Sequence, residues 1–560
     1  MPSTRVITQP PLPPGRACIN CRRRKRKCDS ERPKCSPCIK LGVGDKCAYD
    51  LTPEWLEVEV LTARVHELEE GIRNLTISLK GVASSHVLVG HSGRRQPPMR
   101  VPKPAGPLDV PVSLRDPFVG LLKQREVPRN IRDPLIRECL KHRRLHFPTQ
   151  MNMSRFWYAY KLPPSHPESI HPALLDAMCL LGCLHGGDML QPYERLFYAR
   201  LQRSLYDSLE NADRLLDFIR ASTLAAKYCL TKSRCIEGQH RNAATVRFAM
   251  ACGLHTIDTY DLNSPKLSLL KPPPKDLVDL GEIIHAWWNL FTVDRLGALL
   301  LRVHGTVAHD NETITTMWPC AFEDYESGRA MQAPHKGLSS LRSFESDPNL
   351  ELKASAYDNV YAFRTQGCEM FYHAITLASS FREGHDVSHD ATVAIRATSL
   401  LSDSIVSYRR RECPTFDNAR NKVDCTHDCT LIFSMTITYG ALIQLLHIFA
   451  DKDPASYRQR VEAARACAKL AIEVCRVDAS LLNVTIWLPW YSAYEVLSWE
   501  FTRLKKNRDH KDAAALRADL NGLMDAYMRF AERYSFQNNQ DFQRLSRFDI
   551  HTCEVDTIEL

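Results

Sequence analysis

The 560-residue sequence lacks the motifs by which several large enzyme classes are recognised. It contains no HExxH pair of a metalloprotease, no glycine-rich loop that could cradle a phosphate, and no GxSxG around a nucleophilic serine. We therefore expect a protein that is not an enzyme.

An apolar export signal is also missing, because residues 1–15 are rich in proline and predict a disordered lead. Most of the 20 cysteines are too dispersed for a disulfide scaffold. Six of them, however, lie between Cys18 and Cys47. In a compartment that keeps thiols reduced, such clustering usually indicates a bound metal.

Strand patterns are scarce, since few runs alternate apolar and polar residues, and no internal repeat is evident. Apolar residues instead recur at steps of three and four, which predicts a mostly α protein. The clearest helical patterns cover 215–232, 241–254, 283–302 and 457–477. Breaks are expected at 163–164, at 272–274 and in the polar segment 310–349.

Positive charge is concentrated in one short segment. Residues 16–50 contain eleven Lys or Arg and four acidic residues, so they carry +7 of the chain's formal +8. A basic block on a nearly neutral body indicates a polyanionic partner, either nucleic acid or an acidic membrane surface.

The six clustered cysteines follow the spacing C-x2-C-x6-C-x6-C-x2-C-x8-C, and they are Cys18, Cys21, Cys28, Cys35, Cys38 and Cys47. Zinc prefers four tetrahedral ligands and accepts thiolates well. Six cysteines can serve two such ions only if two of them bridge. Each CxxC should lead into a short helix, and the metals should supply the folding energy of so small a module.

A run of six cations separates the second and third cysteines, namely Arg22, Arg23, Arg24, Lys25, Arg26 and Lys27. Adjacent cations repel one another, so the run favours an anionic ligand over a purely structural zinc knuckle. On a metal-stapled helix such side chains can reach DNA bases and phosphates. The same run can also serve as a nuclear localisation signal.

Residues 16–50, RACINCRRRKRKCDSERPKCSPCIKLGVGDKCAYD, resemble the fungal binuclear zinc cluster. The resemblance implies two zinc ions bridged by Cys18 and Cys35. One ion would bind Cys18, Cys21, Cys28 and Cys35, and the other would bind Cys35, Cys38, Cys47 and Cys18. The resemblance also implies that Arg24 and Lys25 read a CGG triplet, whereas Arg22, Arg23, Arg26 and Lys27 contact phosphates.

A heptad pattern follows over 56–83, with apolar residues at Val58, Leu61, Val65, Leu68, Ile72, Leu75, Leu79 and Val82. The β-branched residues and leucines at its core positions favour a short parallel coiled coil, and hence a homodimer. The alternative is an amphipathic helix folded onto its own body. Residues 84–117 are rich in proline and predict a linker.

From residue 118 to 535 the pattern predicts a large all-helical domain, followed by a tail over 536–560. Four segments resemble the fungal-specific transcription-factor domain, which implies a regulatory role: HPALLDAMCLLGC (171–183), RNAATVRFAMACGLH (241–255), HAWWNLFTVDRLGALL (285–300) and ITTMWP (314–319). Trp287, Trp288, Asp294 and Arg295 match its best-known motif, and we interpret them as core and buried-pair residues.

Three further segments allow two interpretations or carry a weaker signal. Residues 430–450 have no charged side chain and could span a membrane, but their hydroxyl groups and charged surroundings favour a buried core helix. The segment Cys425-Thr-His-Asp-Cys429 could form a second metal site, although a set of ordinary helix-start residues is favoured. Residues 549–560 mix acidic and apolar residues, as activation segments do.

Together these patterns predict a nuclear, zinc-dependent, sequence-specific regulator of RNA polymerase II transcription. We expect a homodimer on paired CGG-like triplets of double-stranded DNA, acting with the transcription machinery and without a membrane partner. Two alternatives stay open. One is a metal-sensing or zinc-buffering protein, and the other is a membrane-surface protein that uses residues 22–27 against anionic lipid.

Overall fold

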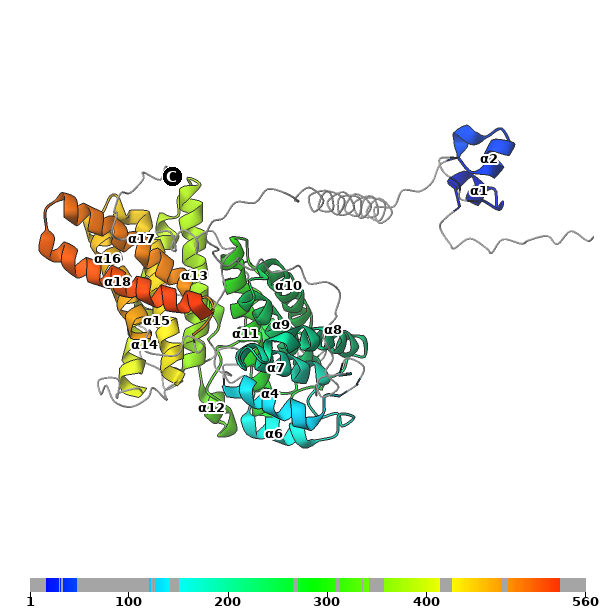
Figure 1. The fold of residues 1–560 in the computed structure, drawn as a ribbon, viewed down its shortest axis with the longest axis horizontal. Coiled ribbons are helices and arrows are strands. Elements are labelled where there is room, and N and C mark those ends of the chain that lie inside the picture. Colours follow the sequence, from blue (N-terminus) through cyan, green and yellow to red (C-terminus); the bar gives the residue numbers. More distant parts are fainter. Residues whose placement is uncertain are drawn as a thin grey trace, which may run out of the picture. The chain divides into compact units, whose positions relative to one another are not determined.

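Helix is the only regular structure in the part of the chain that the structure describes, as the mostly α prediction expected (Figure 1). This computed structural model describes residues 17–29, 31, 34–47, 120–121, 124, 126–141, 151–264, 270, 272–308, 312–334, 336–341, 357–412, 426–474 and 482–533. The predicted lead, coiled coil, linker and tail lie outside the described residues. The chain divides into two units, Met1–Asp109 and Val110–Leu560.

The described residues of the first unit form α1 (Ile19–Arg23), α2 (Ser36–Lys40) and the 3-10 turn η1 (Gly44–Lys46). A cysteine precedes each α-helix: Cys18 is the N-cap of α1, and Cys35 is the N-cap of α2. Each CxxC therefore leads into a short helix, as predicted. The buried side chains described here are almost all cysteines, so this part of the chain has hardly any hydrocarbon core.

The first elements described in the second unit are α4 (Arg129–Lys141), α6 (Met153–Lys161), α7 (Pro172–His185), η2 (Gln191–Tyr193), α8 (Glu194–Glu210), α9 (Leu215–Thr231), α10 (Cys235–Ala251) and η3 (Leu254–Thr256). Helix α7 lies in their core and approaches α4 closely at Gly182, where an added Cβ would lie 2.2 Å from the carbonyl oxygen of Leu135. Glycine is required there because the two backbones touch.

Helix α11 (Leu277–Leu301) is the central helix of the second unit. It begins at Asp276, whose carboxylate accepts hydrogen bonds from the backbone N–H groups of Val278 and Asp279. Every residue from Ile283 to Ala298 is buried. A helix that is buried on all sides must be surrounded by other elements, and α11 contributes to both the α9–α10 core and, through Leu296, the C-terminal core.

The remaining described elements are α12 (Phe322–Glu326), η5 (Arg329–Gln332), η6 (Leu338–Leu341), α13 (Val360–Arg382), α14 (Ser388–Glu412), α15 (Thr426–Ala450), α16 (Pro454–Val474), α17 (Trp487–Lys506) and α18 (His510–Arg533). Helices α13 to α18 share one hydrophobic core. In Figure 1 they form the lime-to-red half of the second unit, and α4 to α10 form the cyan-to-green half.

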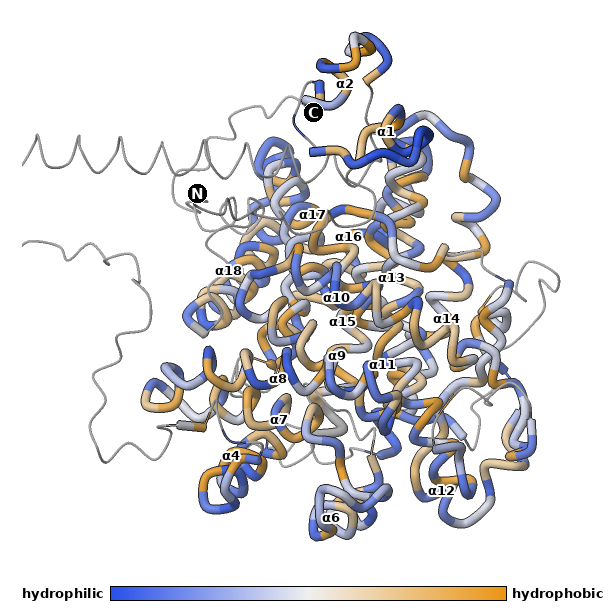
Figure 2. Tube along the Cα trace, turned by 90° about the vertical axis from the view of Figure 1, so that its right-hand side faces the viewer, coloured by the Kyte–Doolittle hydropathy of each residue, from blue (hydrophilic) through white to orange (hydrophobic). Residues whose placement is uncertain are grey.

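Helix α15 contains the segment 430–450 that could have been mistaken for a membrane span. By length and composition it could cross a bilayer, but 72% of its most apolar window is buried inside the bundle. The hydroxyls of Ser434 and Thr436 donate to backbone carbonyls four residues earlier, at 2.8 and 2.7 Å. The segment is a core helix here, as predicted, and Figure 2 shows it among other helices.

The predicted helices agree with α9, α10, α11 and α16, but three of these begin earlier than the apolar pattern. Helix α11, for example, begins at Leu277 rather than 283, because the polar cap Asp276 starts the helix before its apolar face does. The predicted break at 310–349 is only partly right. Its described part contains α12, and Trp318 packs against Trp288 with ring centroids 4.4 Å apart.

Candidate metal centre and nucleic-acid interface

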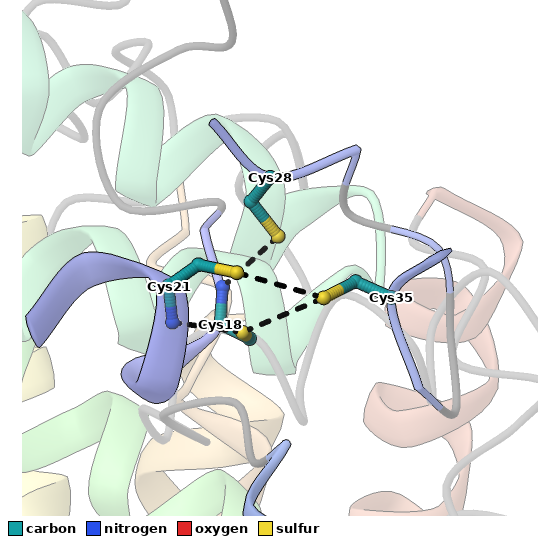
Figure 3. Close-up of side chains that lie close together, drawn as sticks. All are labelled: Cys18, Cys21, Cys28 and Cys35. Atoms are coloured by element: carbon teal, nitrogen blue, oxygen red, sulfur yellow. Dashed lines mark hydrogen bonds between the residues drawn. The ribbon is translucent and has the colours of Figure 1, made fainter. Parts of the chain in front are cut away.

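The six clustered cysteines converge in the first unit. The sulfurs of Cys18, Cys21, Cys28 and Cys35 all lie within 4.8 Å of one another, and so do those of Cys18, Cys35, Cys38 and Cys47. The two sets share Cys18 and Cys35, whose sulfurs are 3.7 Å apart. Figure 3 shows four of these side chains pointing toward a common centre.

These distances fit a pair of tetrahedral metal sites. Zinc–thiolate bonds of about 2.3 Å place neighbouring sulfurs of a tetrahedron about 3.8 Å apart. The sulfurs of Cys21 and Cys35 are 3.7 Å apart, and the sulfurs of Cys35 and Cys47 are separated by the same distance. The donor set therefore suits two soft, four-coordinate ions that share two thiolates.

The two cysteines shared by both sets are the most buried of the cluster. Burial raises the pKa of the Cys18 thiol to about 12 and raises that of Cys35 further. Without a metal these two thiols are protonated at neutral pH. Because the thiolate is the ligand, a metal that binds here must displace those protons.

Asn20 connects the two halves of the module. Its side chain is buried, although its neighbour Ile19 is exposed, and Nδ2 donates a hydrogen bond of 3.3 Å to Sγ of Cys38. This donation is the main reason why the pKa of the Cys38 thiol is lowered to about 7. No sequence pattern named above includes Asn20, although its position inside a CxxC indicates that its amide lies near the ligands.

The two halves end their helices in the same way. After α1, the backbone N–H of Arg26 donates to the carbonyl of Cys21, and the N–H of Lys25 donates to the carbonyl of Arg22. After α2, the N–H of Val43 donates to the carbonyl of Cys38, and the N–H of Gly42 donates to the carbonyl of Ile39. This is the Schellman C-cap, which needs a left-handed residue. The second half uses Gly42 there (φ 66°), but the first half uses Lys25 (φ 50°).

The cationic run lies on this strained turn. Arg22 and Arg23 form the last turn of α1, Arg24 caps the helix, and Lys25 to Lys27 lead away to Cys28. All six side chains are exposed, and Figure 2 shows the run as a strongly hydrophilic stretch. The fold thus presents six positive side chains on one short turn that is tied to the cysteine cluster at both ends.

The helical motif residues in the second unit are core residues, and the buried pair of Asp294 and Arg295 includes a further acid. Trp287, Trp288, Asp294 and Arg295 are all buried. However, the closest acidic partner of Arg295 is Glu369 of α13, with Nε and Oε2 2.7 Å apart. Asp294 also pairs with Arg295, at a longer distance of 4.0 Å between Oδ2 and Nη1, and its carboxylate accepts a hydrogen bond from the Thr306 backbone N–H.

This difference follows from helix geometry. Adjacent residues point about 100° apart on an α-helix, so Asp294 and Arg295 face different neighbours. Glu369, which the sequence analysis missed, is a single acid within an otherwise apolar stretch of α13. The guanidinium of Arg295 also stacks on the rings of Phe291 and Tyr372 at 4.3 and 4.4 Å. This network joins α11 to α13.

The described residues give no support to the alternative second metal site. Cys425 lies outside the described residues, and α15 begins at Thr426, directly after it. Within the part of the chain that the structure describes, the only groups of sulfur, histidine and acidic ligands suited to a metal are the two cysteine sets of the first unit.

Six sulfurs in two overlapping sets of four form a compact donor set that suits metal ions. Residues 16–56 match the family model of the fungal Zn(2)-Cys(6) binuclear cluster domain. The chain therefore carries this domain near its N-terminus, as the cysteine spacing predicted, and the family's description implies that the cluster binds zinc.

Several curated proteins resemble the chain over short segments. The thiamine biosynthesis regulatory protein of Saccharomyces cerevisiae is 42% identical over 71 residues, which is 12% of this chain and 15% of that protein. Transcription factor FBD3 of Fusarium pseudograminearum is 38% identical over 77 residues, 14% and 10% of the two chains. Oleate activated transcription factor 3 of Kluyveromyces lactis is 56% identical over 36 residues, which is 6% of this chain and 5% of that protein.

The matched segments thus span at most 15% of the length of these three relatives. No solved structure matches the chain. The resemblance to a regulatory domain beyond the cysteine module stays a prediction.

Proposed function

We propose that the protein is a zinc-dependent, sequence-specific DNA-binding regulator of RNA polymerase II transcription that acts in the nucleus. The observation that carries this proposal is the exposed run of six cations on the turn between Cys21 and Cys28. The turn is tied to a cluster whose sulfurs fit two metal ions. Relatives named as transcription factors or as a regulatory protein support the same function.

Two zinc ions would fold the module and fix the direction of α1. Cys18 and Cys35 would bridge them, with Cys21 and Cys28 completing one site and Cys38 and Cys47 the other. Zinc would supply charge and rigidity here, and no catalytic chemistry. The side chains of this chain would then make the contacts with DNA.

Arg24 and Lys25 are the residues proposed to read bases. They follow directly after α1, so a module that inserts the C-terminal end of this helix into the major groove would bring both side chains to the base edges. Arg or Lys donating to guanine O6 and N7 is the commonest specific contact there, which suits a CGG-like triplet. Arg22, Arg23, Arg26 and Lys27 would bind phosphates and set the register.

One triplet carries little information, so we propose that two modules act together. The heptads from Val58 to Val82 would pair two copies of the chain, and residues 48–56 would set the distance between half-sites. The helical domain would then regulate the transcription machinery. All of the heptad residues lie outside the described residues.

The experiment is selection of bound sites from random duplex DNA by the full-length, zinc-loaded protein. Paired CGG-like triplets should be enriched, and the double variant Arg24→Ala/Lys25→Ala should lose this selectivity while keeping its zinc. Each lost base contact should weaken specific binding by about 1–3 kcal/mol. Lys40→Ala is the matched control, because Lys40 is also exposed and ends the corresponding helix α2.

Three results would contradict the proposal. One is failure to enrich any motif. Another is unchanged selectivity in the double variant, which would mean that other residues read the DNA. The third is binding to anionic vesicles that is tighter than binding to duplex DNA at physiological salt.

A further inference from the structure

A small cavity lies in the second unit, far along the chain from the cysteine module. Its volume is about 200 Å³, and it lies between α4, α6 and the segment that leads into α7. Its lining includes Glu126, Arg129, Arg132, Tyr160, Leu162 and Ile170. The proposed DNA binding makes no use of this cavity.

Arg132 is the key group of the cavity, because it is a buried cation with spare donors. Its side chain lines the cavity although the residue is only 7% exposed. Nε donates to the Tyr160 hydroxyl at 2.9 Å, and the guanidinium lies 4.7 Å from the centre of the Tyr160 ring. Among the described residues, the two terminal nitrogens have no hydrogen-bond or ion-pair partner.

The nearby acids are already engaged by other groups. Asp133 accepts a hydrogen bond from the Tyr160 hydroxyl. Asp176, which is buried in α7, accepts from Arg200 at 3.0 Å and from Ser204 at 2.7 Å. Arg132 interacts electrostatically with Asp176, but the hydrogen bonds of that carboxylate go to Arg200 and Ser204. The terminal nitrogens of Arg132 therefore keep donors that an anion in the cavity can accept.

The rest of the lining limits which anion fits. Arg129 and Glu126, both exposed at the rim, cancel each other's charge, so the cavity keeps a net positive charge from Arg132. Val127, Leu162 and Ile170 add an apolar wall. A single negative charge next to an apolar body matches this lining, whereas a doubly charged phosphate does not.

We propose that this cavity binds a small organic monocarboxylate, with the carboxylate on the terminal nitrogens of Arg132 and the apolar part against Leu162 and Ile170. The bond from Nε to Tyr160 holds the guanidinium in place before the ligand arrives, so little side-chain freedom is lost on binding. This site is independent of the proposed DNA binding.

The test uses the full-length protein and titrates benzoate by calorimetry at about pH 8.5, with benzamide as its neutral counterpart and inorganic phosphate, which is doubly charged at this pH, as the second probe. We expect benzoate to bind and to raise the Tm of the helical unit, and the other two to do neither. Arg132→Met should weaken benzoate binding roughly tenfold or more, because a charge-assisted bond is lost.

A second variant keeps the test decisive if Arg132→Met does not fold. Ala159→Phe, on the α6 wall, fills the cavity without removing the cation and should also abolish binding. Arg137→Met is the matched control, since Arg137 is an exposed arginine of the same helix. Absence of benzoate binding, equal binding of benzamide or phosphate, or unchanged binding in Ala159→Phe would each overturn the proposal.

Discussion

Lys25 shows how a single residue can indicate function through its backbone. The two halves of the cysteine module use the same helix ending, and the second half has glycine where the first has Lys25. A left-handed conformation costs a side chain of this kind about 1–2 kcal/mol. A strained lysine at a position where glycine would fit is consistent with a role for its side chain in DNA recognition.

Lys25→Gly should therefore separate stability from binding. We expect the zinc-loaded module to gain about 0.5–1 kcal/mol in stability as the strain is relieved. Specific DNA binding should weaken at the same time. Lys25→Ala should weaken binding to the same extent without the gain in stability. Thermal unfolding of both variants measures their stability, and titration with duplex DNA measures their affinity. Equal stability of the two variants would contradict the assignment of strain.

Asn20 is the second residue whose role can be tested alone. Its amide donates to the Cys38 sulfur from the opposite half of the module, so it should stabilise the thiolate that the metal requires. Asn20→Ala should weaken zinc binding roughly 10- to 100-fold, as measured by competition with a chelator. Ile19→Ala is the control, because Ile19 is in the same CxxC but is exposed. Equal zinc affinity in both variants would argue against this role.

At the scale of elements, helix α7 depends on a histidine cap. Nδ1 of His171 accepts a hydrogen bond from the Ala173 backbone N–H at 3.1 Å. Burial and the nearby Arg214 lower the pKa of His171 to about 4, although Asp213 acts in the opposite direction. A proton on Nδ1 would also break the cap. The folded state therefore prefers neutral His171.

The helical unit should consequently lose stability in acid. His171 is neutral in both states above its unfolded pKa of about 6.5, so its titration has no effect there. As the pH falls from about 6.5 toward 4, the unfolded chain takes up the proton first, and stability should fall by about 1–3 kcal/mol. His171→Asn keeps a capping acceptor that does not titrate and should flatten this part of the curve. Denaturant unfolding of both proteins from acidic to neutral pH measures the free energy of unfolding. If its dependence on pH is the same in His171→Asn, the role assigned to His171 is wrong.

Part of the acid sensitivity should remain in that variant. His285 of α11 is buried and stacked on Phe322, and burial lowers its pKa to about 3. Its titration should lower the free energy of unfolding of the helical unit over a wider pH range, from about 6.5 down to about 3.

At the scale of the whole molecule, the two units differ in what holds them together. The described core of the first is made mainly of cysteines, and the second has extensive hydrophobic clusters. We therefore expect so small a module, without an apolar core, to need bound metal to fold. We expect the second unit, with its large apolar core, to fold without a metal.

Chelation should therefore unfold one unit and leave the other intact. Excess chelator should remove the amide signals of α1 and α2 in NMR spectra and abolish DNA binding. The Tm of the helical unit should not change. A lower Tm after chelation would show that the second unit also needs a metal, and it would contradict this division of the molecule.

The sequence alone determined the features that depend on short spacing. The cysteine intervals predicted the metal module, and the run of cations predicted its basic turn, because ligands and charges so close in the chain are brought together by local geometry. Apolar periodicity likewise predicted the positions of α9, α11 and α16. The core location of 430–450 could be inferred from its hydroxyl groups and its charged surroundings.

Tertiary structure decided which distant residues meet. The pairing of Arg295 with Glu369 and the cavity around Arg132 each join segments that no local pattern relates. Such contacts depend on how helices cross and which side chains then share a buried space. A sequence read in one dimension carries periodicity and spacing, but the partner of a buried charge is set only when the helices pack.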